Sequence, residues 1–453
     1  ERPYAMPVSV IDSVLFRDMF GTAAMRTVFD ERATLQRYLD VEAALARVQA
    51  RLGIIPEAAA REITAKARVE LLNEAAVAAE TEIVGYPIIA VVKGLGAACD
   101  DNLGEWAHWG ATTQDIMDTG MALQIRAGLD LIEQELATLT RTLAALAEAH
   151  RATPMAGRTH LQHALPVTFG LKAAIWLAPL LRMRERLDEL RPRVLVGEFA
   201  GASGTLASLG PDGLAVSDAL MVELGLGQPL APWHVARDSV AETICCLALL
   251  TGALSKIATD VMLMMTTEVA EVFEPFVSGR GASSTMPQKR NPISCEVIRG
   301  CAKLVRQHAG AALDAMEADF ERATGPWHLE WAAVPEAFVL TSGALAQANF
   351  MLAGLEVHTD RMRRNLDASQ GLIMAEAVMM GLAPALGRQT AHDIVYDACR
   401  KAIADKSHLK DALLTDPRIA AALTPGDLDG LLDPLNYLGA NDAMIDRVLA
   451  AVS

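Results

Sequence analysis

Aromatic residues and cysteines are scarce in this chain. Only 5% of its 453 residues are Phe, Trp or Tyr, although 52% are hydrophobic, so Ala and Leu supply most of the apolar side chains. That balance disfavours a β-sandwich and is typical of long packed helices. The six cysteines contain no C-x-x-C pair, which argues against a disulfide framework and favours a reducing, cytoplasmic compartment.

Positive charge is also in deficit. The chain has 40 Lys and Arg against 56 Asp and Glu, a net charge of −16, so nucleic acid and anionic membrane surfaces are poor partners. The apolar run "TICCLALLTGAL" is soon interrupted by Lys256, and we expect neither a membrane span nor a signal peptide. An anionic substrate would therefore need a local positive site.

Long helices are the clearest positive signal. Over residues 122–150 a heptad pattern runs through Ile125, Leu129, Ile132, Leu136, Leu139, Leu143 and Leu146, which predicts lengthwise packing against near-parallel helices. Further long helices are expected at about 167–189, 239–272, 294–318 and 335–355, with shorter ones, such as that ending at Gly53, on either side. The sequence predicts an all-α fold without strand-rich regions, in three domains: residues 1–105, 106–358 and 359–453.

Three polar segments interrupt this Ala- and Leu-rich texture. The first, "AHWGATTQDIMDTG" at residues 107–120, offers Thr112, Thr113 and Gln114 as donors where a helix begins, with Asp115 as a cap. Such a terminus suits a carboxylate, and the alternative is an ordinary capping turn.

The second polar segment is "GRTHLQHALPVTFG" at residues 157–170. His160 and His163 lie three apart, but no acidic third ligand or H-E-x-x-H motif accompanies them, so no metal is expected. Between Thr159 and Gln162, His160 is a candidate general acid or base; the alternative is a structural histidine.

The third is "SGRGASSTMPQKRNPISCE" at residues 278–296, too polar for a core strand and too rich in Gly and Pro for a helix. We expect a loop in which Gly279 and Gly281 act as hinges. Its Ser and Thr hydroxyls can do chemistry, and Arg280, Lys289 and Arg290 form a positive island. The alternative is a flexible solvated linker.

Together, these segments resemble the fumarase/aspartase superfamily. Its signature G-S-S-x-M-P-x-K-x-N-P appears at residues 282–292 with Ala282 for the first Gly, and the other two segments follow the family's order and spacing. The resemblance implies an all-α fold and a homotetramer whose core is a central bundle of long helices. It also implies active sites built from three subunits, with no metal or organic cofactor.

The resemblance further implies chemistry on small dicarboxylates or tricarboxylates. Ser283 would be the general base that removes a Cβ proton, Lys289 would stabilise the resulting charge, and His160, oriented by Glu296, would protonate the leaving group. The implied substrate contacts are Thr112, Thr113, Gln114, Thr159, Gln162, Ser284, Met286, Asn291 and, for a distal carboxylate, Arg322.

Two kinds of observation bear on the branch of the family: the resemblance of whole segments and the identity of individual site residues. "ERATGPWHLEW" and "RMRRNLDASQGLIMAEAV" look most like bacterial 3-carboxy-cis,cis-muconate cycloisomerases, and Tyr86 or Pro87 stands where adenylosuccinate lyases usually have a histidine. Typical cycloisomerases have tryptophan at the position of His160 and an apolar residue at that of Glu296. Because this chain keeps both, we expect a lyase that performs a reversible anti β-elimination; the alternatives are a cycloisomerase and a catalytically silent structural homologue.

Overall fold

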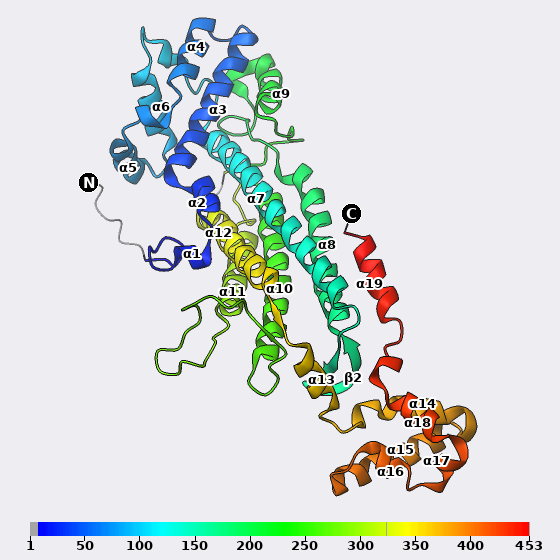
Figure 1. Cartoon of the computed structure of the whole chain (residues 1–453). Helices are drawn as coiled ribbons and strands as arrows, with labels where there is room; N and C mark the ends of the chain where they lie inside the picture. The colour runs from blue at the N-terminus through cyan, green and yellow to red at the C-terminus, as the bar shows by residue number, and fades with distance from the viewer. Residues whose placement is uncertain (1–7, 323, 453) are drawn as a thin grey trace. The chain divides into compact units, whose positions relative to one another are not determined.

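Helices make up most of the protein (Figure 1), in a computed structural model that describes residues 8–322 and 324–452. The predicted all-α class is confirmed. Strands in the described residues form two small antiparallel pairs, β1 (Pro154–Thr159) with β2 (Gln162–Thr168), and β3 (Val272–Phe273) with β4 (Glu356–Val357).

All five predicted long helices are present. They are α7 (Thr113–Ala149), α8 (Phe169–Val194), α10 (Asp238–Met265), α11 (Ile293–Asp314) and α12 (Pro326–Ala353). The heptad positions of α7 are buried from Ile125 to Leu143, but at the end of the helix Ala147 rather than Leu146 is fully buried. A straight helix drifts relative to a strict heptad, which moves the buried stripe by one position.

Two helix boundaries differ most from the prediction. α10 ends at Met265 rather than near Val272, and α12 begins at Pro326, with Pro335 inside it rather than at its start. A proline within a helix removes the amide donor for the carbonyl four residues earlier. Burial of Trp327 and Val334 on the preceding turns compensates, and tertiary packing overrides the proline as a stop signal.

The described chain divides into two compact units. The first contains residues 8–136, 183–255 and 297–347 apart from 323, and the second contains residues 137–182, 256–296 and 348–452. Each of the five long helices has residues in both. The domain boundaries expected after residues 105 and 358 remain a prediction.

Short helices build the rest of the first unit. They are α1 (Arg17–Phe20), α2 (Ala23–Phe29), α3 (Glu31–Arg51), α4 (Glu57–Lys66), α5 (Glu74–Val84), α6 (Ile88–Ala98) and α9 (Gly213–Leu224), with single 3₁₀ turns at Val69–Leu71, Leu103–Trp106 and Ala207–Asp212. Leu39 of α3, Ile63 of α4 and Leu220 of α9 share one core with Ile116 at the start of α7. The first polar segment is thereby attached to a rigid core.

The second unit contains the C-terminal helices. They are α13 (Thr359–Asp367), α14 (Ala375–Leu386), α15 (Arg388–Asp405), α16 (Leu409–Leu413), α17 (Pro417–Ala422), α18 (Pro425–Leu432) and α19 (Asn441–Ala450), with 3₁₀ turns at Leu372–Met374 and Pro434–Asn436. Helices α14 to α18 gather around their own core (Figure 1). The "TPGD" sequence is a helix start: Thr424 and Asp427 form a capping box around Pro425.

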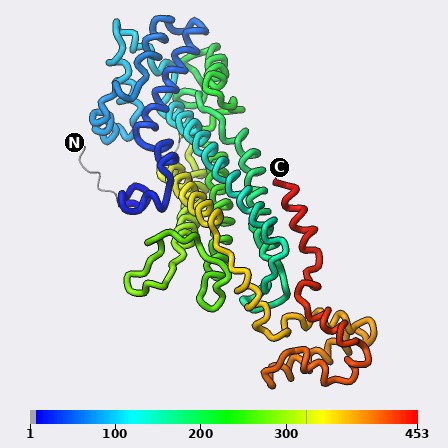
Figure 2. The backbone as a smooth tube through the Cα atoms, in the orientation of Figure 1, coloured from blue at the N-terminus to red at the C-terminus, as the bar shows by residue number. Residues whose placement is uncertain are grey.

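Two irregular segments carry the other polar motifs. The second motif is a hairpin, which was not predicted; it turns at His160 and Leu161, both with positive φ (51° and 64°). Between α10 and α11 the backbone leaves the helices as a long loop before returning at Ile293 (Figure 2). α10 itself is apolar and long enough to cross a membrane, but 56% of its most apolar stretch is buried inside the protein, as in a core helix.

Candidate active site

The signature segment is a loop with a tight neck. The N–H of Asn291 donates to the carbonyl of Gly281 at 3.0 Å, and Ala282 and Arg290 form a β-bridge. Gly281 has φ +68°, and a Cβ atom there would lie 2.6 Å from the Asn291 carbonyl oxygen. In this conformation Gly281 permits the close approach at the neck rather than serving as a free hinge.

Two of the three predicted loop cations have structural partners. The Arg290 guanidinium makes two 2.9 Å hydrogen bonds to the carboxylate of Glu356. The Arg280 guanidinium lies 4.4 Å from the ring centroid of Phe350. The charge of Arg290 is therefore balanced by Glu356, whereas Arg280 packs on a neutral ring and Lys289 is exposed, so a positive island at these two residues remains a prediction.

Ser283 lies inside this loop with its hydroxyl already hydrogen-bonded. Its Oγ accepts hydrogen bonds from the backbone N–H groups of Thr285 (3.3 Å) and Met286 (3.1 Å). Amide donors directed at an oxygen stabilise negative charge on it, so these two contacts favour the alkoxide of Ser283. Ser284 and the Met286 side chain are exposed beside it.

Glu296 stands in the first turn of α11, directly after the loop. The amide groups that begin this helix are satisfied elsewhere, because the buried Glu274 accepts from the N–H groups of Ser294 (3.1 Å) and Cys295 (2.9 Å). Glu296 is exposed and is not needed as a cap. Its carboxylate is available to another group.

His160 is exposed at the tip of the β1–β2 hairpin, together with Thr159 and Gln162. Arg158 of β1 anchors the hairpin, because it donates to both oxygens of the buried Glu271 at 3.0 and 2.7 Å. In the described chain no hydrogen bond joins His160 to Glu296. The proposed pairing of these two side chains remains a prediction.

The first polar segment begins α7, where Asp115 caps the helix as predicted. Its Oδ2 accepts a hydrogen bond from the backbone N–H of Thr112 at 2.9 Å. Thr112 and Thr113 are partly buried, so their hydroxyls lie at the edge of the protein. Because the Thr112 amide is used by Asp115, the two threonine hydroxyls are the groups of this turn that would meet a substrate carboxylate.

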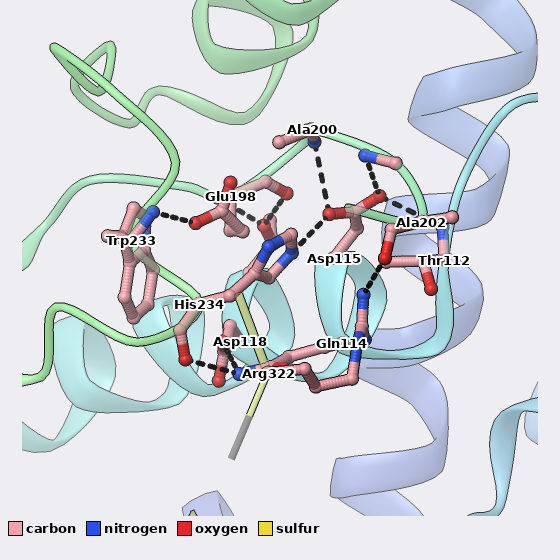
Figure 3. A network of polar contacts seen from close by, with 12 residues as sticks. Thr112, Gln114, Asp115, Asp118, Glu198, Ala200, Ala202, Trp233, His234 and Arg322 are labelled. Carbon is pink, nitrogen blue, oxygen red and sulfur yellow. Dashed lines mark hydrogen bonds and ion pairs between the residues drawn. The ribbon is translucent and has the colours of Figure 1, made fainter. Parts of the chain in front are cut away.

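Asp115 also connects this turn to two distant loops (Figure 3). Its carboxylate accepts from the N–H groups of Ala200 and Gly201, each at 3.0 Å, and from Nε2 of His234 at 2.8 Å. Burial alone would lower the pKa of His234, but the hydrogen bond to Asp115 and the nearby carboxylates outweigh it and raise the pKa.

Glu198 completes this buried group. One of its oxygens accepts the N–H of Trp233 at 2.5 Å, whereas Oε1 is buried without a hydrogen-bond partner. Burial raises the pKa of Glu198 to about 7, despite the opposing effects of His234 and the Trp233 amide.

A metal ion is the other occupant that such residues suggest. In the described part of the chain, Asp115, Glu198 and His234 bring possible ligand atoms within 4.8 Å of one another. However, the two oxygens of Asp115 already accept four hydrogen bonds, which uses its acceptor capacity. The arrangement supports a hydrogen-bond network rather than a metal centre.

Gln114 is placed differently from the other predicted substrate contacts. Its side chain is fully buried, and Nε2 donates to Asp118 (3.0 Å) and to the carbonyl of His234 (2.9 Å). Asp118 in turn pairs with the buried Arg237, which also binds Glu330. Its Oε1 is buried without a hydrogen-bond partner, so a substrate contact of Gln114 would have to be made at this oxygen and remains a prediction.

Arg322 lies close to the Asp115 network. Its Nη2 donates to the carbonyl of Ala202 at 2.8 Å, one residue beyond the Gly201 amide that Asp115 holds (Figure 3). The first unit therefore brings Arg322 and the Thr112–Thr113 turn to one place, as a pair of carboxylate-binding residues requires.

An aromatic cavity in the first unit was not predicted. It has a volume of about 330 Å³ and is lined mainly by apolar residues, among them Tyr38, Trp327 and Trp331. Tyr86 or Pro87 stands where adenylosuccinate lyases usually have histidine; Tyr86 stacks on Trp327 with ring centroids 5.8 Å apart, and Pro87 lines the cavity. Tyr86 has a packing role here, which agrees with the absence of that histidine chemistry.

One chain thus carries three sets of predicted residues, each assembled within itself. The sets are the Thr112–Thr113 turn with Arg322; the hairpin tip with Thr159, His160 and Gln162; and the signature loop with Ser283, Ser284, Met286, Lys289 and Asn291, followed by Glu296. Sequence reasoning missed His234 and Glu198, which organise the first set. Both lie in segments rich in Gly or Pro, and no local pattern marks them.

Known proteins resemble this chain along almost its whole length. Residues 20–306 match the family described as "Lyase", and residues 371–448 match "Adenylosuccinate lyase C-terminus". The chain is 51% identical to trans-aconitate decarboxylase 1 of Mycosarcoma maydis, over 96% of this chain and 88% of that protein. It is 48% identical to a 3-carboxy-cis,cis-muconate cycloisomerase of Pseudomonas aeruginosa over 96% of both chains. The crystal structure of a fumarate lyase from Mesorhizobium sp. BNC1 superposes with a TM-score of 0.90 and 56% identity, over 95% of this chain and 98% of that one.

Proposed function

This chain belongs to the fumarase/aspartase superfamily of lyases and cycloisomerases, and we propose that it catalyses a reversible anti β-elimination. The substrate is a succinyl-type dicarboxylate or tricarboxylate, and the product is fumarate or a related unsaturated acid. The observation that carries this proposal is the hydroxyl of Ser283, which lies in a loop with a tight neck and receives two amide hydrogen bonds.

The first step is removal of a proton from the carbon next to a carboxylate. Ser283 acts as the base in its alkoxide form, which the amides of Thr285 and Met286 stabilise, and it becomes a neutral hydroxyl when it takes the proton. Negative charge then develops on the substrate carboxylate. Lys289 and Asn291 of the loop, with the hydroxyls of the Thr112–Thr113 turn, stabilise that charge in the transition state.

The second step is departure of the group on the neighbouring carbon. His160 protonates this group, and Glu296 orients the imidazole. Both side chains are exposed, and no hydrogen bond joins them within the described chain. We therefore propose that His160 of one subunit meets Glu296 of another.

A homotetramer with shared active sites accounts for this exposure. The long helices leave apolar side chains in solvent, including Leu249 and Leu263 of α10, Leu304 and Leu313 of α11, and Phe350 of α12. Exposed apolar surface of this extent on helices suits association with further copies.

Cycloisomerisation of 3-carboxy-cis,cis-muconate is the second candidate function. It is favoured by the 48% identity to a cycloisomerase, which covers nearly all of both chains. The names of this relative and of trans-aconitate decarboxylase both denote unsaturated acids with three carboxylates. A tricarboxylate is therefore the substrate class to test first.

Substrate assays distinguish these functions. The purified enzyme is incubated with fumarate and a panel of amines and thiols, with 3-carboxy-cis,cis-muconate, and with trans-aconitate, and the products are followed by absorbance and mass spectrometry. Formation of addition products from fumarate supports the lyase. Efficient lactone formation without fumarate chemistry would instead establish the cycloisomerase.

The Ser283→Ala variant tests the base in either reaction. We expect kcat to fall by about 10²–10⁴-fold, because the base acts only in the transition state. Circular dichroism and light scattering control for folding and assembly. A kcat within a few-fold of the unmodified enzyme would reject the role of Ser283.

A further inference from the structure

We infer that His234 is a positioning residue: through Asp115 it holds the Thr112–Thr113 turn in the geometry that binds a substrate carboxylate. The inference rests on the proposed function, in which the hydroxyls of that turn contact the substrate. His234 itself is buried, with 2% of its surface exposed, and is too deeply enclosed to touch the substrate.

A single carboxylate connects the segments involved. Asp115 accepts hydrogen bonds from Thr112 on its own turn, from Ala200 and Gly201 on a second segment, and from His234 on a third. An ionised carboxylate has about four acceptor positions, and all are occupied here. Loss of one donor leaves a buried charge incompletely satisfied, and the remaining three bonds must readjust.

His234 is itself fixed from two sides. Its ring donates from Nε2 to Asp115, and its backbone carbonyl accepts from Nε2 of the buried Gln114. Gln114 and Asp115 are consecutive residues in the first turn of α7. The start of α7 and the loop of His234 are therefore held together by two independent hydrogen bonds.

The same contacts determine where Arg322 lies. Its guanidinium binds the carbonyl of Ala202, the residue directly after Ala200 and Gly201, whose N–H groups donate to Asp115. Movement of the Ala200–Ala202 segment would shift Arg322 relative to the Thr112 hydroxyl (Figure 3). Because the two proposed carboxylate contacts share this support, a defect at His234 should weaken both.

Two amide substitutions differ in whether the hydrogen bond to Asp115 can form. In His234→Gln the side-chain amide lies near the position of Nε2 and can still donate to Asp115. In His234→Asn it lies near the position of Nδ1 and is too short to reach. Both variants are neutral and polar, but Asn is one methylene group shorter than Gln, so they also differ in volume. His234→Met, which is about as long as Gln but has no donor, separates the two effects and should resemble His234→Asn.

The measurement is binding and turnover by the assembled enzyme. Isothermal titration calorimetry with tricarballylate, a saturated tricarboxylate, gives Kd, and the best substrate from the panel gives kcat/KM. We expect His234→Asn to weaken tricarballylate binding about 10-fold and to lower kcat/KM by at least that factor. His234→Gln should stay within about threefold of the unmodified enzyme.

Equal values for the Gln and Asn variants would overturn the positioning role and leave the proposed function standing. Failure of the unmodified enzyme to bind tricarballylate and to convert any acid of the panel would overturn both proposals. A matched control is His308→Asn, which removes another histidine–carboxylate contact of the first unit, with Glu336 at 3.0 Å. That variant should keep the Kd for tricarballylate, and an equal loss of affinity there would also count against the proposal.

Discussion

At the scale of single residues, the buried carboxyl of Glu198 is the group whose charge most depends on the surroundings. Its pKa is raised from 4.5 to about 7 by burial, and that of its neighbour His234 is also raised. A folded-state pKa above the unfolded value means that the folded protein holds the proton more tightly. The contribution of Glu198 to the free energy of unfolding is therefore fully present at pH below the unfolded pKa, and it is lost as pH rises through about 7.

The Glu198→Gln variant tests this pH dependence. Gln cannot ionise, yet its Oε1 still accepts the Trp233 amide, so the variant should be more stable than the unmodified protein at pH 8 by about 1–3 kcal/mol. At pH 5 the two should be nearly equal. Thermal unfolding between pH 5 and 8 measures the difference, with Glu82→Gln on the exposed face of α5 as control. Identical pH profiles for the Glu198 variant and the unmodified protein would contradict the pKa shift.

At the scale of elements, the signature loop depends on backbone geometry that its sequence shows only in part. Gly279 and Gly281 both have positive φ. A Cβ atom at Gly281 would meet the Asn291 backbone, whereas a Cβ atom at Gly279 would have no other atom within 4 Å. The two glycines therefore make a matched pair. Gly279→Ala adds backbone strain alone, whereas Gly281→Ala adds strain and a clash.

Alanine at each glycine tests the importance of the neck. Gly279→Ala should lower kcat/KM by less than about 10-fold, the approximate cost of a left-handed alanine. Gly281→Ala should lower it further, because the neck must open and Ser283 then moves relative to the rest of the site. Steady-state kinetics with the best substrate measures both. Equal losses would show that the neck contact does not matter for turnover.

Elements also show how far the sequence could be read. The long helices were predicted because heptad and 3.6-residue periodicity record their burial directly, as for Ile125 to Leu143. The hairpin was missed because its turn uses positive φ at His160 and Leu161, which no glycine or asparagine announces. Among site residues, hydroxyls and cations in local motifs were recognisable. His234 was not, because its partner Asp115 lies 119 positions away in the sequence.

At the scale of the whole molecule, the exposed apolar side chains on α10, α11 and α12 are those that the proposed homotetramer would bury. We expect light scattering to give the mass of four chains. Leu304→Glu should dissociate the assembly and abolish turnover, because a buried charge at a subunit contact is costly and the active site would be incomplete. Leu414→Glu, at an equally exposed apolar residue after α16, is the control and should remain assembled. An active monomeric Leu304 variant would contradict the shared site.

The four hydrogen bonds at Asp115 also impose an order on biosynthesis. The amides of Ala200 and Gly201 are synthesised 85 and 86 residues after this carboxylate, and the imidazole of His234 follows later still. A nascent chain that has emerged only through α7 has one of these four donors, the Thr112 amide, and lacks the other three. The Thr112–Thr113 turn must therefore reach its final hydrogen bonding late, after more than half of the polypeptide has left the ribosome.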